Sequence, residues 1–219
     1  MMLAVIKRDL TLAWRSGGTW LFGVFFFLLF IALSAIAMGG SLNLMRPLAP
    51  ALIWLAVIFS ALLSVASIFQ ADFEDGNLAQ FKISGQNMLS LCAAKGISFF
   101  FIAILPLIIA APFAALLFDM PTDILLATLL SLLLSSPALA VYGVFCSAIL
   151  AGRQGGGFLI VLITAPFIMP LLIFGLEAIS GFKTDGVLAL EFRVLIGLSL
   201  IAIAVGLPAA SAALKANLE

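Results

Sequence analysis

Histidine is absent from this 219-residue chain, and charged residues make up only 9% of it. Without histidine the sequence lacks the commonest metal ligand and the usual general base. It also offers no paired aspartates or other catalytic set, so we expect neither an enzyme nor a metal site. The two cysteines, Cys92 and Cys146, make no disulfide framework. Nucleic acid is not an expected partner, because the net charge is zero and basic residues do not cluster.

Apolar residues are what the chain has in excess. They make up 65% of the sequence, against roughly 45–50% in soluble domains, so the chain cannot cover itself with polar surface in water. We therefore predict an all-α integral membrane protein. Its length allows about six helical crossings of about 20 residues each and leaves no room for a separate soluble domain. Residues 1–219 are interpreted as one transmembrane domain.

The order of apolar and polar stretches predicts where the chain crosses the membrane. Residues 1–18 form an amphipathic pattern, with apolar and basic residues on opposite helical faces, which predicts an interfacial helix. The predicted spans cover about residues 20–38, 49–69, 97–118, 124–150, 158–174 and 194–213. Prolines in the third to fifth spans are expected to bend them. A looser outer segment, 175–193, contains Glu177.

Basic residues predict the orientation. With the amino terminus in the cytoplasm, seven lie inside and three outside, which satisfies the positive-inside rule. The inner residues are Lys7, Arg8, Arg15, Lys82, Lys95, Arg153 and Lys215, and the outer ones are Arg46, Lys183 and Arg193. No charged residue is expected well inside any span, which argues against an ion-coupled transporter.

Charge is concentrated in residues 70–86, QADFEDGNLAQFKISGQ, which we place in the cytoplasm. Its acidic residues are Asp72, Glu74 and Asp75, and an apolar stripe is formed by Phe73, Leu78 and Phe81. This spacing predicts a short amphipathic helix, capped near Gly76, at the membrane surface. Two interpretations stay open: a docking site for a soluble protein, or a solvated turn beside the membrane. A calcium loop is not expected, because the acidic residues lack its order.

Two other polar features have modest interpretations. Residues 152–157, GRQGGG, lack the Lys-Ser/Thr pair of a P-loop and join two predicted membrane helices, so nucleotide binding is not expected. Any ATP-driven work therefore needs a partner. Ser60, Ser64 and Ser67 share one face of the second span. Close helix packing is the favoured interpretation of these serines, and a polar lining for a substrate path is the alternative.

Taken together, these features resemble the CcmB family, the haem exporter membrane subunit of bacterial cytochrome c maturation. The resemblance covers nearly the whole chain and is carried by IFQADFEDGNLAQF, Lys95, SSPALA and GRQGGGFLIVLITAPFIMPLLIFG. Two stretches depart from the usual pattern. Residues 135–140 read SSPALA where relatives usually read GTPALS, and residues 165–170 read APFIMP where relatives tend to read LPLYIP.

The resemblance implies an ABC-exporter-like permease in the bacterial inner membrane, with both termini cytoplasmic. Its implied partners are a cytoplasmic ATPase, a haem-handling membrane subunit, a small single-span protein and a second copy of the chain. The segment 70–86 would carry a coupling helix that contacts the ATPase. The matching residues are Asp72, Phe73, Glu74, Asp75, Gly76 and Leu78. Arg153 is a candidate for a second cytoplasmic contact.

Haem is the substrate that the resemblance implies, with ATP hydrolysed by the partner. Axial iron ligands are normally His, Met, Cys or Tyr, and because histidine is absent we expect no firmly bound haem. Tyr142 and Met169 are candidates for weak contacts. Two mechanisms stay open: coupling of ATP hydrolysis to haem export, or a scaffold that lets the ATPase release haem from a partner. A drug or lipid exporter fits the topology but not the motif combination.

Overall fold

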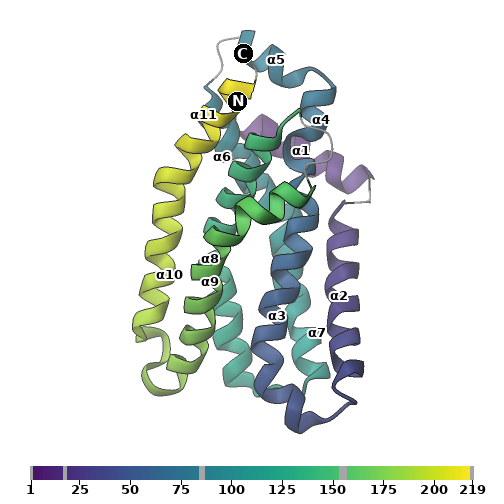
Figure 1. Ribbon diagram of the computed structural model, residues 1–219, viewed down its shortest axis with the longest axis vertical. Helices are drawn as coiled ribbons and strands as arrows, with labels where there is room; N and C mark the ends of the chain where they lie inside the picture. The colour runs from purple at the N-terminus through teal and green to yellow at the C-terminus, as the bar shows by residue number, and fades with distance from the viewer. Residues whose placement is uncertain (1, 17–18, 84–86, 153–156, 218–219) are drawn as a thin grey trace.

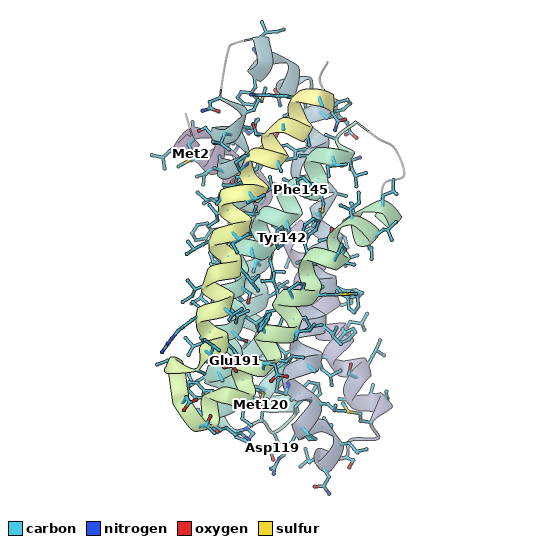
Figure 2. The ribbon with its side chains drawn as sticks, turned by 60° about the vertical axis from the view of Figure 1, so that its left-hand side comes forward. Met2, Asp119, Met120, Tyr142, Phe145 and Glu191 are labelled. Atoms are coloured by element: carbon cyan, nitrogen blue, oxygen red, sulfur yellow. The ribbon has the colours of Figure 1, made fainter. Side chains whose placement is uncertain are left out.

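The structure is a computed structural model that describes residues 2–16, 19–83, 87–152 and 157–217. Every regular element within these ranges is helical. Long helices run side by side, and both chain termini lie at the same end of the bundle (Figure 1). We call this the terminal end. At the far end lie the turns that contain Asp119 and Met120 and the start of the helix that contains Glu191 (Figure 2).

The elements follow one another with short connections. In chain order they are α1 (Met2–Ser16), α2 (Thr19–Ala37), α3 (Leu42–Val65), α4 (Ser67–Glu74), α5 (Asn77–Ile83), α6 (Met88–Phe99), the π-helical turn η1 (Phe100–Ile104), α7 (Leu105–Leu117), α8 (Thr122–Leu150), α9 (Gly157–Asp185), the 3-10 turn η2 (Gly186–Leu188), α10 (Leu190–Ile201), the π-helical turn η3 (Ala202–Gly206) and α11 (Leu207–Asn217). The helix α1 lies across the terminal end, near α4 and α5 (Figure 1).

The all-helical membrane class predicted from composition is confirmed. Within the described residues, five helical segments are long and apolar enough to cross a membrane: Leu42–Glu74, Met88–Leu117, Thr122–Leu150, Leu159–Asp185 and Leu190–Asn217. The remaining predicted span forms α2, whose apolar part, Leu21–Ala37, is shorter than these five. The predicted count of six spans is therefore met in five cases and left open for α2.

Two helix boundaries differ from the prediction. Helix α6 begins at Met88 instead of residue 97, because the Asn87 side chain caps it and accepts a hydrogen bond from the Leu89 N–H at 3.0 Å. The prediction of a looser segment at 175–193 is wrong except for a short turn at 186–189, because α9 continues to Asp185 and α10 begins at Leu190. Gly175, taken as a helix end, is a packing residue within α9.

Trp54 explains why that glycine is needed. The indole is fully buried, and a Cβ at Gly175 would lie 2.3 Å from its ring. Its Nε1 also donates to Ser131 Oγ at 3.0 Å. Trp54 thus joins α3, α8 and α9 in the centre of the bundle. A glycine within a helix commonly has such a packing reason.

The helices accommodate prolines in two ways, by a preceding π-helical turn or by a serine hydroxyl that bonds to the freed carbonyl. Pro106 and Pro208 each follow a π-helical turn, η1 or η3. A proline cannot donate to the carbonyl four residues earlier and clashes with it, and in both cases that carbonyl lies within the wider π turn. Pro137 lies within α8, where Ser136 Oγ donates to the Leu133 carbonyl at 2.7 Å. This is the carbonyl that the proline leaves without its helical donor. Helix α9, which contains two prolines, changes direction within the bundle (Figure 1).

The predicted serine face on α3 has a packing role. Ser60 and Ser64 are buried, and a Cβ at Gly23 of α2 would lie 3.8 Å from the Ser60 carbonyl and 4.0 Å from Ser64 Oγ. Small residues of this kind let two membrane helices approach closely. The third serine, Ser67, is exposed at the start of α4 and bonds back to the Ser64 carbonyl at 2.8 Å.

A buried charge cluster at the terminal end

The acidic segment forms two short helices rather than one. Helix α4 ends at Glu74, and α5 begins at Asn77. Gly76 lies between them with φ 71°, a left-handed conformation that glycine adopts without steric cost. The predicted cap near Gly76 is confirmed, but the second helix was not predicted. Both helices lie at the terminal end of the bundle (Figure 1).

The six predicted coupling residues face two ways. Glu74, Asp75 and Gly76 are exposed, and Phe73 is partly so. Asp72 and Leu78 are buried, with Leu78 only 1% exposed. The resemblance places Asp72 at the ATPase contact, but its carboxylate points into the protein, towards Lys95.

Phe73 also has an internal contact. Its ring lies over Gly152 at the end of α8, where an added Cβ would be 2.4 Å from the ring. Gly152 has φ 81°, so both the backbone conformation and the space require glycine. The first glycine of GRQGGG therefore packs against the acidic segment. Arg153, the candidate for a second cytoplasmic contact, lies outside the described residues.

Asp72 belongs to a cluster of four charged side chains from three helices. Arg8 and Asp9 come from α1, Asp72 from α4 and Lys95 from α6. The Asp72 carboxylate lies 2.5 Å from Lys95 Nζ and 2.8 Å from Arg8 Nη2. Asp9 lies 2.9 Å from Lys95 Nζ and 2.8 Å from Arg8 Nη2. Each cation thus contacts both carboxylates. We call these four residues the charge cluster.

The charge cluster is mostly removed from water. The side chains of Asp72, Lys95 and Asp9 are 5%, 8% and 10% exposed, whereas Arg8 is 33% exposed. Partial burial lowers the pKa of Arg8, but its hydrogen bond to Asp9 and the charge of Asp72 outweigh burial and raise this pKa above its ordinary value. Two positive and two negative charges balance within the cluster, as burial of charge requires.

Helix α1 turns Arg8 and Asp9 towards the bundle, whereas its other charged residues, Lys7 and Arg15, are exposed. Val5, Arg8 and Asp9 are three and four positions apart and therefore share a face, and Val5 is buried beside them. Leu3 and Trp14 are 77% and 80% exposed. Residues 2–16 thus form a helix with some apolar residues exposed and Val5 buried, and the position of this helix at the membrane interface stays a prediction.

Three members of the charge cluster were not foreseen as partners of Asp72. The available signal was Lys95, which stands within the apolar run that begins at Met88. A charge inside such a run needs an opposite charge nearby, and placing the span at residue 97 left Lys95 outside it. Lys95 lies near the start of the segment Met88–Leu117, which is longer than the roughly 20 residues that one crossing needs, so the statement that no charged residue lies well inside a span stays a prediction.

A cavity of about 450 Å³ lies beside the charge cluster and is bordered by α1, α4, α6, the end of α3 and η1. Ser64 and Ser67 line it together with Ser98. Among the described residues, Ser98 Oγ is buried and has no hydrogen-bond partner. The packing around the charge cluster is therefore open on one side.

The side chains of Tyr142 and Met169, the two candidate haem contacts, do not face a common site. Tyr142 of α8 packs on Phe167 of α9, with ring centroids 5.1 Å apart, in the middle of the bundle (Figure 2). Met169 follows Phe167 by two residues, about 200° around the helix axis, and is 60% exposed. Met169 thus points away from Tyr142. Within the described residues, no group of three His, Cys, Asp or Glu side chains is placed to hold a metal ion.

These features define a multi-pass helical membrane protein in which the N-terminal helix and a short acidic segment are joined by buried charges. The family model for the CcmB protein matches residues 1–217, and the chain belongs to this family. It is 36% identical to heme exporter protein B of Bradyrhizobium diazoefficiens, over 99% of this chain and 98% of the relative. It is 34% identical to heme exporter protein B of Rhodobacter capsulatus, over the whole of both chains. The resemblance noted from the sequence is confirmed.

Proposed function

We propose that this chain is the membrane subunit of an ABC-type complex that exports or delivers haem for cytochrome c biogenesis. Membership of the CcmB family and full-length similarity to proteins named heme exporter protein B support the proposal. The chain has no P-loop sequence, so ATP binding and hydrolysis belong to a partner. Membership of the family supports a location in the bacterial inner membrane, and the distribution of basic residues favours an orientation with the termini and α4–α5 in the cytoplasm.

The main support for the coupling role is that the acidic segment has one side buried in the protein and one side exposed. Asp72 is held by buried ion pairs, while Glu74 and Asp75 on the same segment are exposed. A surface that is fixed from within and charged on its outside suits docking of a soluble ATPase. We define the docking face as Phe73, Glu74, Asp75 and Gly76. Electrostatic contacts at such a face set the partner's orientation and association rate.

The haem-handling step is assigned to the complex rather than to this chain alone. Further subunits in our proposal are a haem-handling membrane protein, a small single-span protein and a second copy of this chain. A firm axial ligand would come from one of them, because this chain has no histidine.

The second candidate function is a scaffold that lets the ATPase release haem from the haem-handling partner. It needs the same docking face, so only a vectorial assay separates the two. In sealed vesicles that contain the purified complex, ATP-dependent accumulation of haem in the lumen supports export. Release of haem without accumulation supports the scaffold.

Removal of charge from the docking face tests the proposed function. The double variant Glu74→Gln/Asp75→Asn should lower co-purification of the ATPase about tenfold, since two exposed charges each contribute up to about 1 kcal/mol. Replacement of both Glu74 and Asp75 by lysine, which reverses the charge, should lower co-purification of the ATPase further. The matched control is Asp123→Asn/Asp185→Asn, which removes two exposed charges from the far end. Equal ATPase recovery with all variants would refute the docking face.

A further inference from the structure

The charge cluster connects helices that the chain itself connects only indirectly. Asp72 lies 64 residues after Arg8 and 23 residues before Lys95, yet contacts both. Lys95 and Arg8 in turn both contact Asp9. Asp72 therefore cannot move away from α6 or α1 without breaking a buried ion pair. Leaving a buried charge unpaired is strongly unfavourable.

We propose that the charge cluster makes α1, α4 and α6 move as one rigid unit when the ATPase engages the docking face. This inference rests on the proposed function and assigns positioning roles to Arg8, Asp9 and Lys95. The movement of α4 then enters the membrane through Lys95 and α6, and α1 follows through Arg8. The interfacial helix is part of the coupling apparatus rather than a passive anchor.

The structure also contains a place where that movement can be absorbed. Five residues after Lys95, α6 passes into the π-helical turn η1. Such turns mark points at which helical hydrogen bonding is already altered. The 450 Å³ cavity is lined by Ser98 just before η1 and by Ile102 and Ala103 within it. The cavity is thus shared between this unit and η1, and it leaves room for the unit to shift against η1.

The test uses a variant that keeps the charges balanced. Asp72→Asn/Lys95→Met removes one negative and one positive charge and leaves the Arg8–Asp9 pair in place. Within the full complex, this variant should retain the ATPase and its ATP hydrolysis, because the docking face is unchanged. Cytochrome c maturation should fall at least tenfold, because α4 no longer moves α6. The single variant Lys95→Met should also lose activity. Lys95→Arg, which keeps the cation, should retain most of the wild-type activity.

A distance measurement adds a readout that a purely structural role would not move. Spin labels at the exposed positions Thr11 of α1 and Gln70 of α4 should give one narrow distance distribution, unchanged by a non-hydrolysable ATP analogue. The distance from Gln70 to a label at the exposed Leu21 of α2 should change. In Asp72→Asn/Lys95→Met, the Thr11–Gln70 distribution should broaden with the analogue. Cys92 and Cys146 are buried, which favours selective labelling.

The outcomes separate the two proposals. If the wild-type chain recovers no ATPase, the proposed function fails, and the rigid unit fails with it. If the ATPase is recovered but the Thr11–Gln70 distance changes with the analogue, or the Gln70–Leu21 distance does not, only the rigid unit is refuted. Wild-type maturation by Asp72→Asn/Lys95→Met, or loss of the ATPase from that variant, also refutes it.

Discussion

Replacement of Lys95 by methionine is the sharpest test of how the charge cluster stabilises the fold. Methionine has a similar length and fills the space, so the change removes the charge while leaving little cavity. The Lys95 side chain is 8% exposed and contacts two carboxylates at 2.5 and 2.9 Å. After the substitution, Asp9 and Asp72 share Arg8 as their remaining cation.

The expected cost follows from burial. Removal of one partner from a buried ion pair costs about 3–5 kcal/mol, because the other charge stays buried and unpaired. Arg8 lies 2.8 Å from both carboxylates, which limits the loss, so we expect about 3 kcal/mol for Lys95→Met and a similar cost for Asp72→Asn. The balanced double variant should lose less than the sum of the two, by at least about 2 kcal/mol.

The measurement is the free energy of unfolding of the purified chain in mixed detergent micelles, for wild type, both single variants and the double variant. The control Lys215→Met removes an exposed lysine from α11 and should change stability by less than about 0.5 kcal/mol. Additive losses from Lys95→Met and Asp72→Asn would show that the two residues do not interact. The contact on which our reasoning depends would then be absent from the protein in solution.

Three further outcomes are expected. Gly175→Ala should destabilise the chain by about 1–3 kcal/mol in the same unfolding assay, because its Cβ would lie 2.3 Å from the Trp54 ring. Gly197→Ala, where an added Cβ meets nothing within 4 Å, should instead be neutral or stabilising by up to about 1 kcal/mol. Gly76→Ala should cost about 1–2 kcal/mol through its positive φ alone, seen as faster hydrogen exchange confined to α4 and α5; unchanged exchange there would contradict it. The purified chain without its partners should show no stoichiometric haem absorbance, and a tightly bound haem would overturn our assignment of firm ligation to another subunit.

The helical membrane architecture was predictable because it depends on length and hydrophobicity alone. A run of 20 apolar residues has few alternatives to a spanning helix, and five of the six predicted spans fall within helical segments long and apolar enough to cross a membrane. The ends were less certain, because they depend on local contacts. The Asn87 cap extends α6 to include Lys95, and Trp54 makes Gly175 a packing position instead of a helix end.

The spacing of the charged residues did not predict which of their side chains would be buried and which exposed. Asp72, Glu74 and Asp75 look equivalent in the sequence, since all three lie in one acidic run. Asp72 alone of the three joins the buried cluster, because its partners come from α1 and from α6, far away in the chain. No local pattern carries that information. A lysine within an apolar run was the one available sign that a carboxylate had to be buried.

Stability alone does not explain why a buried charge cluster holds these three helices together, because apolar residues of similar volume often stabilise a fold equally well. In a membrane, however, apolar contacts discriminate poorly between protein and lipid, because lipid tails are as apolar as leucine. Helix α1 exposes Leu3 and Trp14, so an apolar inner face would leave its rotation undetermined. Arg8 and Asp9 remove that ambiguity, because only one rotation of α1 brings both to Asp72 and Lys95. We infer that the charge cluster is needed to orient α1, and that replacing all four residues by apolar ones would preserve stability while losing a unique α1 orientation. The orientation can be followed by the accessibility of a label at Thr11, which should become heterogeneous in the four-residue variant and stay uniform in the wild type.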